Sequence, residues 1–188
     1  MKQLLRMRHQ EKRNMLSDAQ VSGKSEKIME RFLALPEAQK AKTVMAYVGV
    51  KKEAQTTELI RRLLREGKRV LVPVTDFKKK ELVPSEIFGI EDLELKGFGL
   101  MEPKESALRP VPLGQIGLIV VPGVSFDACG GRIGSGYGFY DKMLRKISTK
   151  VTLVGFCFEE NLDERLPCES HDVRMNLVVT EARAIRCK

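Results

Sequence analysis

The sequence predicts a single three-layer α/β domain over residues 1–188, with a mostly parallel central sheet and helices on both faces. Two observations lead to this prediction. Short apolar runs of strand length alternate along the chain with segments of helical periodicity, which is the pattern of strands joined by helical crossovers. In addition, a chain of 188 residues with 43% apolar content can bury one core and needs no second domain.

The first part of the chain alternates between predicted helices and strands. Residues 2–16 are rich in helix formers, and residues 17–20 have the form of a capping box that opens a second helix before Pro36. A strand, helix, strand order of this length implies a right-handed parallel crossover. The elements after the second helix are a strand over 43–48, a helix with Thr56 as its N-cap and Gly67 as its stop, and a strand over 69–72.

The remainder is organised around the stretch from Leu118 to Leu144. An unbroken apolar run over 118–121 predicts a strand buried on both faces, and a glycine-rich loop follows it. The pattern predicts no regular element in residues 73–117 beyond an edge strand over 81–83. With the later elements, the order predicts a Rossmann-like sheet; these elements are a helix over 139–147 and strands over 152–156 and 176–180.

The composition argues against a membrane-spanning, a secreted or a zinc-binding protein. No apolar stretch approaches the roughly twenty residues of a membrane span, and no signal-peptide pattern opens the chain, so we expect a cytoplasmic protein without membrane contact. The four cysteines form no Cys-x-x-Cys pair, which argues against a zinc site. The formal charge of +8 favours a polyanionic partner: nucleic acid, a nucleotide or a polyglutamylated small molecule.

The glycine-rich loop is the strongest chemical signal in the sequence. Five glycines fall between Gly130 and Gly138, directly after a buried strand and before a helix, and Arg132 adds a fixed charge. Backbone N–H groups without side chains, beside the positive end of a helix dipole, are suited to phosphate. The spacing matches neither of the common phosphate loops. The alternative is a glycine-rich surface turn, against which the preceding strand and the following Asp141 both argue.

Three candidate segments follow predicted strands at their carboxyl ends. Glu53 comes after the strand over 43–48, the glycine loop after the strand over 118–121, and Asp172 after the strand over 152–156. Ligands of parallel α/β sheets bind outside the carboxyl ends of the strands. The sequence therefore predicts that these three segments converge on one crevice.

At this loop the sequence resembles a known family. The segment PGVSFD, then two residues, then GGRIGSGYGFYDKML resembles the signature of 5-formyltetrahydrofolate cyclo-ligases, and weaker matches extend along most of the chain. The resemblance implies an enzyme that uses ATP and Mg²⁺ to convert 5-formyltetrahydrofolate to 5,10-methenyltetrahydrofolate, with ADP and phosphate released. It implies small-molecule partners only, with no nucleic acid or membrane, and we expect a monomer.

The resemblance also implies roles for particular residues. The catalytic residues would be Arg132, Tyr140 and Asp141, and Mg²⁺ would be held by Asp141 and Asp172. The folate would contact Val48, Glu53, Ser135, Gly136, Tyr137, Gly138 and Phe139. ATP would contact Lys2, Arg6, Arg132, Gly134, Ser135, Gly136, Tyr137, Gly138, Phe139 and Tyr140.

Alternative interpretations remain for two segments. The basic residues of the first helix could simply be solvated or belong to a transit peptide, although Lys2 and Arg6 share a helix face as phosphate ligands would. The fragment GYGFYDK partly matches the aromatic strand of an RNA-recognition module, but here it leads into a helix. A third alternative is a nucleotide-binding protein of the same fold without ligase activity.

Overall fold

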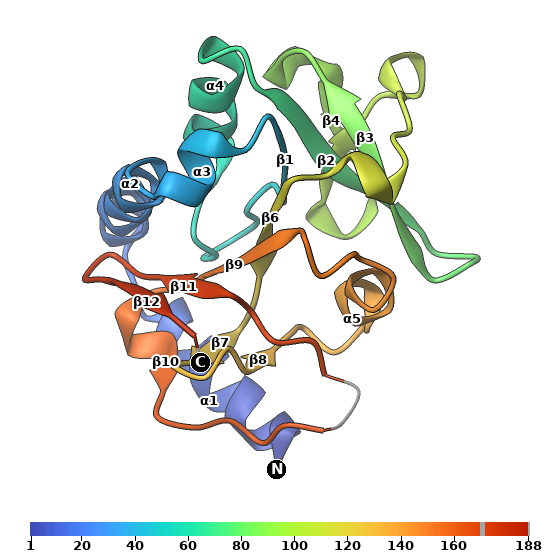
Figure 1. Cartoon of the computed structure of the whole chain (residues 1–188). Coiled ribbons are helices and arrows are strands. Elements are labelled where there is room, and N and C mark those ends of the chain that lie inside the picture. The colour runs from blue at the N-terminus through green and yellow to red at the C-terminus, as the bar shows by residue number, and fades with distance from the viewer. Residues whose placement is uncertain (170–171, 188) are drawn as a thin grey trace.

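A computed structural model describes residues 1–169 and 172–187, which fold around one seven-stranded sheet (Figure 1). The strands are β1 (Thr43–Ala46), β2 (Arg69–Asp76), β3 (Glu81–Ile87), β6 (Leu118–Pro122), β9 (Thr152–Phe156), β11 (Leu177–Val179) and β12 (Ala184–Arg186). Their order across the sheet is β12-β11-β9-β6-β1-β2-β3. The five central strands run parallel, and the edge strands β3 and β12 are antiparallel to their neighbours.

The strand order places a switch point between β1 and β6. From β1 the chain continues to β2 on one side, whereas from β6 it continues to β9 on the other side. The crevice outside such a switch point is where ligands bind in open α/β sheets. The sheet topology therefore predicts a ligand site at the carboxyl ends of β1 and β6.

Helices cover both faces of the sheet, as predicted. Helices α2 (Asp18–Leu33), α3 (Pro36–Lys40) and α4 (Thr57–Arg65) lie on one face and α5 (Phe139–Leu144) on the other (Figure 1). Alternate residues of each strand point to opposite faces, so Val44 packs in the core with Phe32 of α2, whereas Met45 packs in the core with Met143 of α5. The three-layer α/β prediction is confirmed.

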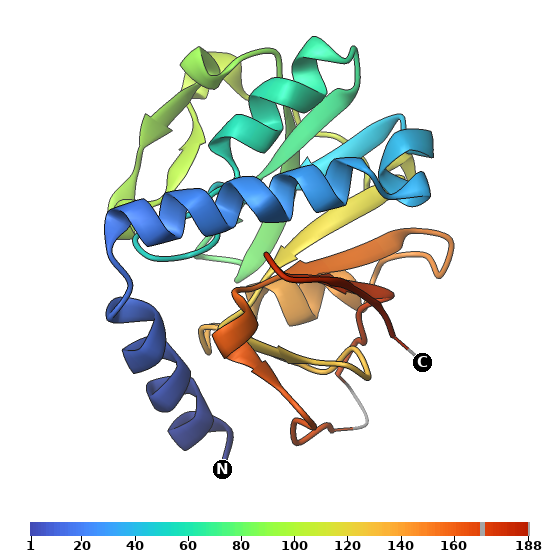
Figure 2. The ribbon, with the colours of Figure 1, turned by 90° about the vertical axis from the view of Figure 1, so that its left-hand side faces the viewer.

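Helix α1 (Lys2–Asn14) lies outside these layers, beyond the start of α2 (Figure 2). The capping box is confirmed, since the Ser17 hydroxyl accepts from the N–H of Gln20 and the Gln20 side chain accepts from the N–H of Ser17. Thr56 precedes α4, but its hydroxyl donates to the Tyr47 carbonyl instead of capping the helix. Among the described residues, no helix is both long and apolar enough to cross a membrane.

Several short elements were absent from the sequence prediction. A second sheet of order β10-β7-β8 lies beyond the carboxyl end of β6, and a hairpin of β4 and β5 lies in the segment that the pattern left unassigned. Some predicted elements are also shorter: the first strand ends at Ala46 and the helix after the glycine loop ends at Leu144. The additional elements are β4 (Leu93–Leu95), β5 (Met101–Pro103), β7 (Ser125–Asp127), β8 (Arg132–Ile133), β10 (Leu162–Asp163) and 3-10 helices Ile90–Asp92, Gly97–Gly99, Glu105–Ala107, Leu113–Gln115 and Glu159–Asn161.

Candidate active site

The base of the glycine loop is held by the buried carboxylate of Asp127. This carboxylate is 2% exposed and accepts from the N–H groups of Cys129 at 2.9 Å, Gly131 at 2.7 Å and Leu166 at 2.7 Å. A Cβ on Gly131 would lie 2.5 Å from an Asp127 oxygen, so glycine is required there. The loop therefore starts from a fixed position next to β10.

The tip of the loop leaves its backbone donors free. Gly136 and Gly138 have φ angles of 104° and 74°, which other residues rarely adopt. Within the described residues, the N–H groups from Gly134 to Gly138 donate no hydrogen bond to the protein. Ser135 to Gly138 are exposed. A group of free N–H donors at an exposed turn is an anion-binding arrangement.

Arg132 connects the loop to the sheet and to α5. Its side chain is 5% exposed, forms an ion pair with Asp141 and donates to the Pro122 carbonyl at 3.1 Å. The guanidinium also lies 5.9 Å from the ring centre of Tyr140. The three predicted catalytic residues are therefore in one cluster at the carboxyl end of β6.

Four basic side chains share one face of α1, at positions 2, 6, 9 and 13. Lys2 lies 2.8 Å from Asp172 and 2.9 Å from Glu169, and Arg6 donates to the Gly134 carbonyl at 2.8 Å. Partial burial opposes the charge of Lys2, but its hydrogen bonds to Asp172 and Glu169 raise its pKa. The helix therefore brings two predicted ATP ligands to the glycine loop and to the Asp172 segment.

A cavity of about 470 Å³ opens at the switch point between β1 and β6. Among its lining residues are nine that the sequence analysis named: Val48, Glu53, Arg132, Ser135, Tyr137, Gly138, Phe139, Tyr140 and Asp141. Lys2, Arg6, Gly134, Gly136 and Asp172 are not among its lining residues. The expected convergence of the Glu53 segment and the glycine loop thus occurs, without Asp172.

Glu53 lies in the loop that follows β1, and its side chain is 23% exposed. The N–H of Val50 donates to its Oε2 at 3.2 Å, and the Tyr47 hydroxyl donates to the Ala54 carbonyl at 2.8 Å, which holds the loop. Burial raises the pKa of Glu53, while Arg13 and the Val50 N–H act in the opposite direction. The result is a desolvated carboxylate facing the cavity.

The Tyr140 hydroxyl is buried and has no hydrogen-bond partner in the described part of the chain. Burial raises the pKa of Tyr140 above its ordinary value, so the hydroxyl stays protonated at neutral pH. An unpaired buried hydroxyl is costly unless a ligand supplies its partner. Tyr140 is therefore a donor available to whatever enters the cavity.

Three of the lining residues to which the sequence analysis assigned no role make aromatic or polar contacts at the cavity. Phe77 packs edge-on against Phe139 at 5.6 Å between ring centres, and Glu102 accepts from the N–H of Thr75 at 2.9 Å. The third, Arg13, faces Glu53. Nothing in the local pattern marked Phe77 or Arg13, because each reaches the cavity through tertiary packing. Glu102 lies in the segment GLMEP, which resembles an element of the family, but the sequence assigned it no role.

The two predicted magnesium ligands line different cavities. Asp141 lines the cavity described above, whereas Asp172 lines another, of about 930 Å³, together with Asp127 and Arg174. Asp141 pairs with Arg132, and Asp172 with Lys2. In the described residues, no group of three or more His, Cys, Asp or Glu side chains could hold a metal. Each carboxylate suits Mg²⁺ chemically, and their joint role as magnesium ligands stays a prediction.

The chain is similar in sequence to known proteins over most of its length. Residues 1–181 match the model of the 5-formyltetrahydrofolate cyclo-ligase family. The chain is 30% identical over 175 residues to the 5-formyltetrahydrofolate cyclo-ligase of Escherichia coli K12, which covers 92% of this chain and 96% of the relative. It is 32% identical over 153 residues to the enzyme of Mycolicibacterium smegmatis, which covers 77% of this chain and 76% of that relative.

Solved structures agree as well. The Aquifex aeolicus 5,10-methenyltetrahydrofolate synthetase superposes with a TM-score of 0.86 at 33% identity, covering 100% of this chain and 93% of that one. The synthetase from Mycoplasma pneumoniae, at 21% identity, has a TM-score of 0.76 and shares the fold over 96% of this chain and 98% of its own. The chain therefore belongs to the 5-formyltetrahydrofolate cyclo-ligase family.

Proposed function

We propose that the 470 Å³ cavity binds 5-formyltetrahydrofolate and that the adjoining glycine loop binds the triphosphate of ATP. Membership of the family makes the protein an enzyme that converts 5-formyltetrahydrofolate to 5,10-methenyltetrahydrofolate, and the family implies ATP as a co-substrate. The observation that carries the proposal is the meeting of a desolvated carboxylate, Glu53, with free loop N–H groups beside one switch point.

On the folate side, Glu53 accepts from the pterin. The pterin edge has an amino group and a ring N–H side by side, which a carboxylate can accept as a bidentate pair. Val48, Tyr137 and Phe139 form apolar and aromatic walls of the same cavity. Their packing holds the ring system while the carboxylate sets its orientation.

On the ATP side, charge neutralisation is divided between two segments. Lys2 and Arg6 from α1, with Arg132 from the loop, offset the charge of the triphosphate, and the N–H groups from Gly134 to Gly138 bind its oxygens. Mg²⁺ on the phosphates would be held by Asp141, whose oxygens suit it, and would lower their negative charge. Asp172 as a further ligand stays a prediction, since it lines a different cavity and pairs with Lys2.

The chemistry follows from the substrate. The N5-formyl group is an amide, whose carbonyl carbon resists attack and whose oxygen is a poor leaving group. Transfer of the γ-phosphoryl group to the formyl oxygen forms an O–P bond as ADP leaves. N10 then attacks the formyl carbon and loses its proton to solvent, and the C–O bond breaks with release of phosphate. The residues contribute positioning and charge stabilisation, with the Tyr140 hydroxyl as a neutral donor near the reacting oxygens.

A direct assay tests the proposal. Purified protein is mixed with Mg-ATP and 5-formyltetrahydrofolate, and the absorbance of the methenyl product is followed with and without ATP. We expect ATP-dependent product formation with one ADP per turnover. ATP binding without product would favour the non-ligase nucleotide-binding alternative, and retention on RNA without ATP would favour the RNA-binding alternative.

A further inference from the structure

We propose that Arg13 is a positioning residue for the folate, which holds the Glu53 carboxylate in place at the pterin edge. The inference rests on the proposed function of the cavity. Arg13 lies near the end of α1, one of four basic residues on the face that also carries Lys2 and Arg6. The same helix face thus extends from the phosphate loop to the folate cavity.

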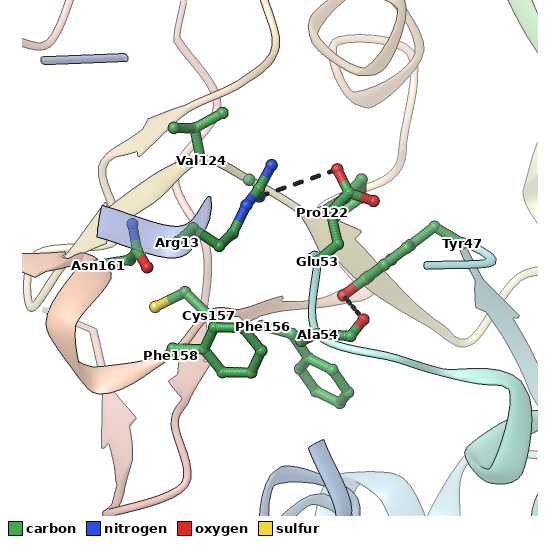
Figure 3. Close-up of a pocket in the computed structure, with 11 residues that line it drawn as sticks. Arg13, Tyr47, Glu53, Ala54, Pro122, Val124, Phe156, Cys157, Phe158 and Asn161 are labelled. Atoms are coloured by element: carbon green, nitrogen blue, oxygen red, sulfur yellow. Dashed lines mark hydrogen bonds and ion pairs between the residues drawn. The ribbon is translucent and has the colours of Figure 1, made fainter. Parts of the chain in front are cut away.

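Arg13 and Glu53 form a mostly enclosed ion pair. The Nη1 atom of Arg13 lies 4.0 Å from Oε1 of Glu53, and the two side chains are 13% and 23% exposed. Figure 3 shows the guanidinium extending from α1 towards the carboxylate, beside Val124 and Pro122. An ion pair at this depth is weakly screened by water, so it constrains the carboxylate more than a surface pair would.

The Arg13 guanidinium still has a hydrogen-bond donor without a partner in the described residues. Its buried Nε has no hydrogen-bond partner in the described residues, and the ion pair with Glu53 is the polar contact that the structure records for this side chain. An arginine that only supports packing would have its buried N–H groups paired with carbonyls. Arg13 lines the proposed folate cavity as well, so its side chain borders the space that the ligand would occupy.

The charge of Arg13 also affects the protonation of Glu53. Burial raises the pKa of this carboxyl, and Arg13 is the largest opposing influence, ahead of the Val50 N–H and Lys51. Tyr47 from the end of β1 and Tyr140 from α5 also face it, and burial keeps both hydroxyls neutral. Without Arg13, the carboxyl takes up a proton at higher pH and can no longer accept both pterin donors.

The test compares Arg13→Met with Arg8→Met, which removes the same charge from an exposed position on the same helix. The affinity for 5-formyltetrahydrofolate is measured by calorimetry from pH 5.5 to 8, and that for ATP at pH 7.5. We expect Arg13→Met to weaken folate binding about tenfold at pH 7, and further as the pH falls, with ATP binding unchanged. Arg13→Lys should restore part of the affinity, and Arg8→Met should match the wild type.

Two outcomes separate the inference from the function on which it rests. Wild-type turnover, combined with the same folate affinity and pH profile in Arg13→Met and Arg8→Met, overturns the inference alone. A wild-type protein that neither binds nor converts the folate overturns both. If Arg13→Met unfolds, Arg13→Gln keeps a polar side chain without the charge, and the same pH profile is expected from it.

Discussion

The Nε2 atom of His9 lies 2.7 Å from Oδ2 of Asp163, and the His9 side chain is fully buried. The side-chain amide of Asn161 donates to the His9 carbonyl at 3.0 Å. These contacts fix the middle of α1 against β10 and the 3-10 helix before it. They leave Lys2 and Arg6 on one side of the anchor and Arg13 on the other.

The first prediction concerns the pH dependence of stability. Burial lowers the pKa of His9, ahead of the opposing effect of Asp163. The unfolded chain therefore takes up a proton near pH 6.5 while the folded protein does not, so this contribution to stability is complete above about pH 6.5 and is lost as the pH falls through the lower folded pKa. We expect Tm to fall between pH 7 and pH 5, measured by circular dichroism at constant ionic strength.

The control variant His9→Gln should have a lower Tm at pH 7 and a shallower dependence of Tm on pH. Equal slopes would contradict this role, because both proteins share all carboxylates.

The second prediction concerns Asp141. Asp141→Asn should lower kcat/KM about 10²-fold or more, because the amide cannot balance Arg132 and is a weak ligand for a magnesium ion on the nucleotide. Its side chain is 37% exposed, so Tm should stay within a few degrees of the wild-type value. Turnover is followed by the methenyl absorbance, with Asp18→Asn, an exposed carboxylate at the start of α2, as the control. Wild-type turnover in Asp141→Asn would remove this residue from the mechanism.

The third prediction concerns Lys2. Lys2→Ala should cost about 3 kcal/mol of transition-state stabilisation, or roughly 10²-fold in kcat/KM, since a charged contact to the transferring phosphates is lost. Arg8→Ala, which removes an exposed charge from the same helix, should leave the rate unchanged. Steady-state kinetics with varied ATP measures both. A normal rate in Lys2→Ala would mean that the contacts of this residue with Asp172 and Glu169 are structural only.

The sheet could be predicted because each of its central strands appears in the sequence as a short apolar run. The run of residues 118–121 is apolar throughout, as a strand buried on both faces must be, and residues 153–156 likewise carry no polar side chain. The structure confirms both strands. The small sheet could not be predicted in this way. Strands β8 and β10 have two residues each, and they form because Asp127 fixes the turn and Leu162 pairs with Phe126, far away in the sequence.

The site was predictable to the extent that its residues follow apolar strands. Glu53 and the glycine loop meet at one cavity for this reason. Arg13 was not predictable, because a basic residue in a basic helix carries no local mark, and only the path of α1 past the end of β1 brings it to Glu53. Which cavity Asp172 lines was likewise not predictable, because its ion pair with Lys2 joins residues that are far apart in the sequence.

Helix α1 contributes Arg6 to the proposed ATP site and Arg13 to the proposed folate site, so the two sites share one helix. A ligand that holds Arg6 against the glycine loop also restricts the motion of Arg13, because the two residues belong to one helix with His9 as its pivot. The entropy lost in fixing the helix is lost only once, so we expect ATP and the folate to bind with positive cooperativity, each raising the affinity for the other by the same factor.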